Sequence, residues 1–156
     1  MQNKTEITIE EFKKMLDTGM ITIDKKGKLS GNYNLDILKS LKKQETLRNI
    51  ALKLRFENYL IENNIIFEKE TVYNKIMNCK EKFRADYYLK ELNILVEING
   101  GQWENGRHNR GAKIKGKEYT YYERDLFKLN LANKHGFTVF QFTYEMLARK
   151  EYEKLI

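Results

Sequence analysis

The chain is poor in cysteine and has no long apolar run, and each absence excludes a class of protein. Cys79 is the single cysteine, which excludes an internal disulfide and any zinc site built from cysteines. No run of about 18 apolar residues occurs, and the N-terminus lacks the apolar segment of a signal peptide. We therefore expect a cytoplasmic protein with no membrane partner.

Length and charge narrow the remaining classes. The 156 residues are 41% hydrophobic, which suits one domain of ordinary size that can bury a core without disulfides. Lys and Arg number 29 against 22 Asp and Glu, a net charge of +7. That excess favours a polyanionic partner, although many basic proteins are merely soluble. We expect residues 1–45 to form a short helical appendage of unknown role and residues 46–156 to form the main domain.

Local patterns predict four helices. Capping boxes at 8–11 and 120–123 begin the first and third, which end near Asp17 and at Gly136. The second begins at Thr46, and the last follows Thr143. The second helix is expected to pack into the core through Leu47, Ile50, Ala51, Leu54 and Ile61. The third helix carries Tyr122, Leu126 and Leu129 on one face, and the last carries Met146, Leu147 and Leu155.

Four strands are predicted between these helices. Residues 65–73 alternate and are rich in β formers, residues 83–100 suit a hairpin, and residues 137–142 suit a fourth strand. Because a helix separates the third and fourth strands, their connection should be a crossover to a parallel neighbour. The predicted fold class is therefore α/β, a mixed sheet in the order αβββαβ flanked by helices.

Two carboxylates are predicted to face each other across the hairpin. A turn centred on residues 91 and 92 pairs Leu89 with Ile94 and, further along, Asp86 with Glu97. Cβ atoms in such pairs lie roughly 5 Å apart, so two like charges repel. A bound divalent cation, a shared proton or the nearby Arg84 would each offset the repulsion.

A family resemblance accompanies this pair. Four segments in order resemble the PD-(D/E)XK nuclease superfamily: 83-FRADYYLKELNILVEINGGQW-103, 106-GRHNRG-111, Asp125 with Lys128, and 137-FTVFQFT-143 after Gly136. The set is most similar to small, often phage-encoded endonucleases of the very-short-patch-repair-like branch, and it covers about residues 47–147. The resemblance implies a restriction-endonuclease-like fold and metal-dependent hydrolysis of DNA.

In such nucleases a strand aspartate and the acid of the third strand hold a hard cation. The resemblance assigns those roles to Asp86 and Glu97, with the Ile98 carbonyl as a further ligand. Magnesium suits oxygen ligands and keeps several waters, and manganese should substitute for it. The lysine of the family signature is replaced by Asn99, whose amide donates hydrogen bonds but carries no charge.

Three residues could supply part of what Asn99 lacks, namely Lys128, Gln102 and His108. In the repair-type branch a histidine beyond the third strand acts near the nucleophile, which makes His108 the first candidate for a general base or water positioner. An exposed loop histidine is the alternative interpretation.

Nucleic-acid contacts are expected next to the site. The loop 106–117 contains no acid, and its cations would hold phosphates, although a merely solvated loop has the same composition. Trp103 could stack on a base or anchor the loop to the core. The residues expected to touch nucleic acid are Arg84, Gln102, Trp103, Arg107, Arg110, Lys113, Lys115, Lys117 and Tyr121.

Two further acids are candidates for supporting roles. Asp125 shares a helix flank with Lys128, so the two either face the site or form an ordinary i,i+3 salt bridge. Glu57 lies beside the apolar stripe of the second helix, and it either joins the site or extends to solvent.

The sequence thus predicts a magnesium-dependent endodeoxyribonuclease whose partner is DNA. One alternative is a DNA-binding module or regulator that has lost catalysis at Asn99, and it would bind equally well with a chelator present. Another is a junction-resolving nuclease, which would require a homodimer to place two sites on opposite strands.

Overall fold

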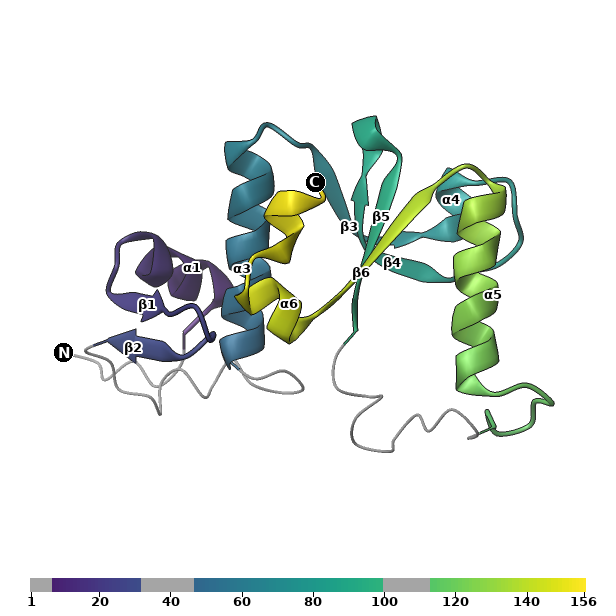
Figure 1. The fold of residues 1–156 in the computed structure, drawn as a ribbon, viewed down its shortest axis with the longest axis horizontal. Coiled ribbons are helices and arrows are strands. Elements are labelled where there is room, and N and C mark those ends of the chain that lie inside the picture. Colours follow the sequence, from purple (N-terminus) through teal and green to yellow (C-terminus); the bar gives the residue numbers. More distant parts are fainter. Residues whose placement is uncertain (1–6, 32–46, 100–112) are drawn as a thin grey trace. The chain divides into compact units, whose positions relative to one another are not determined.

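The computed structural model describes residues 7–31, 47–99 and 113–156 (Figure 1), and its contacts divide the chain into two compact units. The terminal unit comprises residues 1–59 and 144–156, and the central unit comprises residues 60–143. This division falls inside a helix, whereas the domain boundary predicted at residues 45 and 46 lies outside the described residues and stays a prediction.

The terminal unit joins the two ends of the chain. It contains α1 (Ile9–Asp17), β1 (Ile21–Ile23), β2 (Leu29–Gly31), most of α3 (Leu47–Glu62), α6 (Tyr144–Ala148) and the 3₁₀ turn η3 (Glu151–Lys154). The capping box of α1 is confirmed, because Thr8 and Glu11 exchange hydrogen bonds between side chain and backbone. β1 and β2 form an antiparallel pair that is not among the four predicted strands.

α1 and α3 share a core in this unit. Phe12 and Met15 of α1 pack with Ile21, Ala51 and Leu54, so the predicted appendage is tied to α3 by apolar contacts. On another side of α3, Phe56 meets Tyr152 edge to face at 4.9 Å between ring centroids.

Two predictions, one for α3 and one for the last helix, are wrong. Ile61 was expected in the stripe of α3 but is 53% exposed, because α3 is buried on several sides through Leu52, Phe56 and Leu60. The last helix is split, since Lys150 adopts a left-handed φ of 55° that separates α6 from η3 and leaves Leu155 exposed.

The central unit is built on a four-stranded mixed sheet in the order β3-β4-β5-β6. The strands are β3 (Phe67–Val72), β4 (Arg84–Leu89), β5 (Ile94–Asn99) and β6 (Thr138–Thr143), with helices α4 (Tyr73–Ile76) and α5 (Tyr121–Lys134). The first three strands pair antiparallel and β5 pairs with β6 in parallel. The predicted α/β class, with its αβββαβ order and its crossover, is confirmed.

The β4–β5 hairpin has the predicted register. Tyr88 pairs with Leu95 and Leu89 with Ile94 across the 3₁₀ turn η1 (Lys90–Leu92), and the ladder ends at Tyr87 and Val96. One step beyond, Asp86 uses its side chain to accept the backbone N–H of Ile98 at 2.6 Å. A short acceptor side chain competes with the ladder in this way.

α5 begins at the expected capping box of Thr120 and Glu123 and ends before Gly136. Its Ala132 packs with Tyr73, Leu95 and Phe137 in the core of the central unit. Among the helices within the described ranges, none is long and apolar enough to cross a membrane.

Candidate nuclease site

One cavity of the central unit collects the predicted acids. Its volume is about 710 Å³, and Asp86 of β4, Glu97 of β5 and Asp125 of α5 all line it. The register of the hairpin brings the first two to one face of the sheet, and α5 covers that face through Ala132 and Leu95. The pairing of Asp86 and Glu97 inferred from spacing therefore corresponds to proximity in one cavity.

Lys128 connects α5 to this acid pair. Its ammonium lies 2.5 Å from Glu97 Oε1, and it also donates to the backbone carbonyl of Arg84. The two side chains of the ion pair are only 19% and 14% exposed. Lys128 therefore reaches into the cavity. This agrees with the interpretation in which the helix flank of Asp125 and Lys128 faces the site.

The electrostatics of the cavity favour a further cation. Burial is the main cause that raises the pKa of Glu97 from 4.5 to about 7, the Lys128 ammonium opposes the rise, and the charges of Asp86 and Asp125 add to it. A carboxyl group with this pKa is only partly ionised at neutral pH. A divalent cation would stabilise its charged form, so the site gains charge balance from such an ion.

The donor set fits magnesium in kind. Mg²⁺ is commonly bound by one or two carboxylates, waters and substrate phosphates rather than by a full protein cage. Asp86 and Glu97 supply two carboxylates, and Ile98 also lines the cavity. Within residues 7–31, 47–99 and 113–156, no cluster of three or more His, Cys, Asp or Glu side chains suits a metal, so waters or phosphate would have to complete the coordination.

Gln141 and Tyr73 are among the cavity residues that were missed from the sequence. Gln141 of β6 lies beside Glu97 in the parallel register and accepts from Asn99 Nδ2 at 3.4 Å. Tyr73, at the start of α4, is fully buried and also lines the cavity. The lone amide in the otherwise apolar strand 137–142 was a usable signal for Gln141, but no local pattern distinguishes Tyr73 from a core aromatic.

The packing of α5 differs from the prediction. Tyr122, Leu126 and Leu129 were expected on an apolar face distinct from the flank of Asp125 and Lys128. Tyr122 and Leu126 are 37% and 40% exposed, and all five residues line the same cavity. Ala132 of that flank is buried in the core. This orientation of α5 about its axis allows Lys128 to form its ion pair with Glu97.

The predicted nucleic-acid contacts fall into two groups. Gln102, Trp103, Arg107, His108 and Arg110 lie outside the described residues, so their roles stay predictions. Arg84 lines the cavity, Tyr121 is half-buried at the start of α5, and the exposed lysines of the segment before α5 are Lys113, Lys115 and Lys117.

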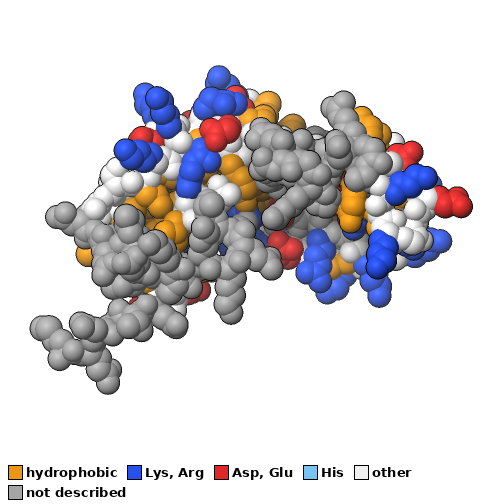
Figure 2. Space-filling view, turned by 90° about the horizontal axis from the view of Figure 1, so that it is seen from below, with side chains coloured by type: hydrophobic (Ala, Val, Ile, Leu, Met, Phe, Trp, Pro, Cys, Tyr) orange, Lys and Arg blue, Asp and Glu red, His pale blue; other side chains and the backbone are white. Residues whose placement is uncertain are grey.

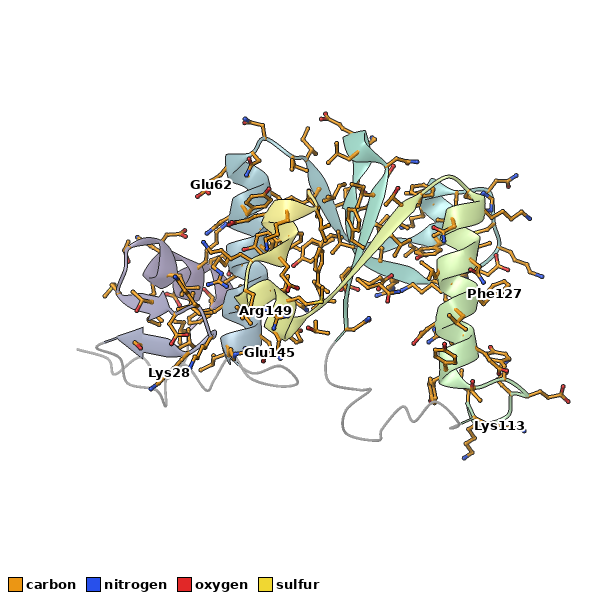
Figure 3. The ribbon with its side chains drawn as sticks, viewed as in Figure 1. Lys28, Glu62, Lys113, Phe127, Glu145 and Arg149 are labelled. Carbon is orange, nitrogen blue, oxygen red and sulfur yellow. The ribbon has the colours of Figure 1, made fainter. Side chains whose placement is uncertain are left out.

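That segment lies on a surface rich in Lys and Arg. Figure 2 shows Lys and Arg side chains beside exposed apolar and some acidic ones at the right-hand end of the view, where α5 and the segment before it lie. In Figure 3, Lys113 lies just before the start of α5 and Phe127 lies on the helix itself. Glu57 belongs to the terminal unit and is only 6% exposed, so the alternative that it extends to solvent is wrong, and its supporting role in the site stays a prediction.

Comparisons with known proteins add little. No family model matches the chain, and no curated protein matches it. A solved structure, the catalytic domain of the homing endonuclease I-Bth0305I, matches with 18% identity and a TM-score of 0.42. The match covers 67% of this chain and 84% of that one. At this level of similarity, the function has to be argued from the site.

Proposed function

We propose that this protein is a magnesium-dependent DNA endonuclease of the PD-(D/E)XK type. The observation that supports the proposal most is the meeting of Asp86, Glu97 and Lys128 in one cavity, from two adjacent strands and the crossover helix. Two acids on neighbouring strands and a lysine are the residue types that phosphodiester hydrolysis by this family requires. The basic segment before α5 supports DNA as the partner.

Lys128 is the proposed substitute for the lysine that Asn99 replaces. Its ammonium pairs with Glu97 and with the carbonyl of Arg84, so the cation enters from α5 rather than from β5. When a phosphodiester enters, the ammonium can turn to a non-bridging oxygen and stabilise the charge of the pentavalent state. Asn99 keeps the accessory role of orienting Gln141 or a water.

The carboxylates complete the proposed mechanism. Asp86 and Glu97 would hold the Mg²⁺, and the ion would supply activation of a water and neutralisation of phosphate charge. Hydrolysis would form a bond between a water oxygen and phosphorus and break the bond to the leaving oxygen, which would take up a proton from solvent. His108 remains the proposed group that accepts the proton of the water.

Nicking of supercoiled plasmid tests the proposal. Wild type, Glu97→Ala and the control Glu91→Ala are compared at low salt with magnesium, manganese or chelator. Glu91 lies in the exposed turn of the same hairpin, so its loss should leave nicking unchanged. We expect metal-dependent nicking that only Glu97→Ala abolishes. Absence of nicking by the wild type, together with gel shifts that persist in chelator, would identify a DNA-binding module instead.

A further inference from the structure

Tyr73 carries a polar group that the fold does not use. The side chain is 0% exposed, yet its hydroxyl has no hydrogen-bond partner in the described part of the chain. Buried tyrosine hydroxyls usually find a partner, and an unsatisfied buried donor costs about 1–3 kcal/mol. A phenylalanine would fill the same space without this cost, so the hydroxyl calls for an explanation outside the fold.

The surroundings fix this side chain in place. The Tyr73 ring meets Phe83 edge to face at 5.9 Å, and the backbone N–H of Tyr73 donates to the Phe83 carbonyl at 2.8 Å. On the ring face, Lys128 Nζ lies 5.6 Å from the centroid. The same ammonium is 2.5 Å from Glu97 Oε1, so the three side chains are neighbours in one cavity.

The Tyr73 hydroxyl retains its proton and can therefore donate a hydrogen bond. Burial raises the pKa of Tyr73 well above its usual value, and the nearby charge of Glu97 adds to the rise. A neutral hydroxyl beside a carboxylate can donate a hydrogen bond to it. In this structure the ammonium of Lys128 forms an ion pair with Glu97 Oε1. The Tyr73 hydroxyl has no acceptor among the described residues.

A bound metal ion would change that arrangement. A divalent cation on Glu97 competes with the Lys128 ammonium for the carboxylate, and repulsion between the two cations drives the ammonium away. Carboxylates that ligate metals are themselves held by hydrogen bonds, and such supporting groups fix their orientation. Tyr73 is a neighbouring donor with no other partner among the described residues.

We propose that the Tyr73 hydroxyl is a positioning group that donates to the Glu97 carboxylate when Glu97 holds a divalent cation. This inference rests on the proposed function, since it needs the metal to bind. It predicts that the hydroxyl contributes to metal affinity and contributes nothing to the stability of the metal-free fold.

Manganese affinity measured without any substrate tests the inference. Free Mn²⁺ is followed by electron paramagnetic resonance while protein is added, and Tm is measured in chelator. Tyr73→Phe should bind Mn²⁺ about 10–100-fold more weakly than wild type, with an equal or higher Tm in chelator. Tyr152→Phe is the matched control, because Tyr152 is equally buried but its hydroxyl bonds Arg55 in the terminal unit.

The control should show the opposite pattern, with unchanged Mn²⁺ affinity and a lower Tm. Equal Mn²⁺ affinity in Tyr73→Phe and wild type would overturn the inference while leaving the nuclease proposal standing, even if nicking were lost. A lower Tm of Tyr73→Phe in chelator would show that the hydroxyl supports the fold, and would also overturn it. No Mn²⁺ binding by the wild type would remove the proposed metal site, and the inference with it.

Discussion

Arg55 in the terminal unit and Lys128 in the central unit are both half-buried cations, but their partners differ. Arg55 donates from Nη2 to the carbonyls of Leu147 and Ala148 at 3.0 and 2.7 Å, which belong to the last two residues of α6. Lys128 instead pairs with Glu97, a carboxyl whose pKa is raised. The first cation completes a helix end, and the second balances charge in a cavity.

This comparison teaches which buried charges belong to the fold and which belong to a site. Backbone carbonyls at a helix end have a fixed position and need a donor in every state of the protein. A carboxyl buried beside other acids gains from any cation, so its present partner can be exchanged. Comparing each substitution in the cavity with a control substitution in the terminal unit tests this distinction.

The largest effect is expected from removing an acid of the cavity. Asp86→Asn keeps an oxygen to accept the Ile98 N–H but removes the charge, so nicking should fall on the order of 10³-fold. DNA binding should be kept or become tighter, because repulsion from phosphate is lost. Asp17→Asn, which alters the acceptor of Asn58 in the terminal unit, should leave nicking unchanged. Plasmid nicking rates and gel shifts measure both, and equal rates for Asp86→Asn and wild type would place the site elsewhere.

The pH dependence of stability sharpens the same contrast. The folded-state pKa of Glu97 is about 7 against 4.5 in the unfolded chain, so the folded state binds more protons between these values. The contribution of Glu97 to the free energy of unfolding of the protein should therefore be largest below pH 4.5. This contribution should fall by about 3 kcal/mol as the pH rises through about 7. Urea unfolding in chelator at pH 5 and pH 8 should show this loss in wild type.

Glu97→Gln should remove this part of the slope. Glu145→Gln in the terminal unit should keep it, because that carboxyl is exposed and paired with Arg48 (Figure 3). If the free energy of unfolding depended on pH equally in wild type and Glu97→Gln, the pKa of Glu97 would not be raised in the folded state.

Substituting the two cations should separate site from fold. Lys128→Met should lower nicking on the order of 10²-fold and raise the pKa of Glu97 further, since the ammonium is the group that lowers it. Arg55→Met should leave nicking intact but lower the free energy of unfolding by about 1–3 kcal/mol, because the charged hydrogen bonds to the Leu147 and Ala148 carbonyls are lost. Nicking assays and urea titrations give both quantities. Similar losses of activity from the two variants would contradict the distinction.

The smallest effect concerns the exposed lysines. Replacing Lys113, Lys115 and Lys117 together by Gln should reduce the log–log salt dependence of DNA binding by roughly 0.9 for each lysine that contacts a duplex phosphate. The control replaces three exposed lysines of the terminal unit, Lys25, Lys26 and Lys28. Fluorescence anisotropy at several salt concentrations measures the slopes. Equal reductions in both triple variants would indicate binding through net charge alone.

Short-range rules were sufficient for much of the fold. Both capping boxes formed as predicted, because the pairs 8–11 and 120–123 bond within one helical turn. The hairpin register followed from alternation and the turn at residues 90–92. By contrast, the outward position of Ile61 on α3 and of Tyr122 and Leu126 on α5 depended on which neighbours each helix meets, and a single helix pattern does not contain that information.

The sequence by itself determined the order of helices and strands along the chain, the mixed sheet and the presence of Asp86 and Glu97 on one face, since a period of two and one crossover leave few alternatives. Only the tertiary structure decided that Lys128 of α5 meets Glu97, that Gln141 lies beside it, and that the hydroxyl of Tyr73 is buried in the same cavity. These contacts join residues that are distant along the chain. They depend on the rotation of α5 and on burial, which no local pattern fixes.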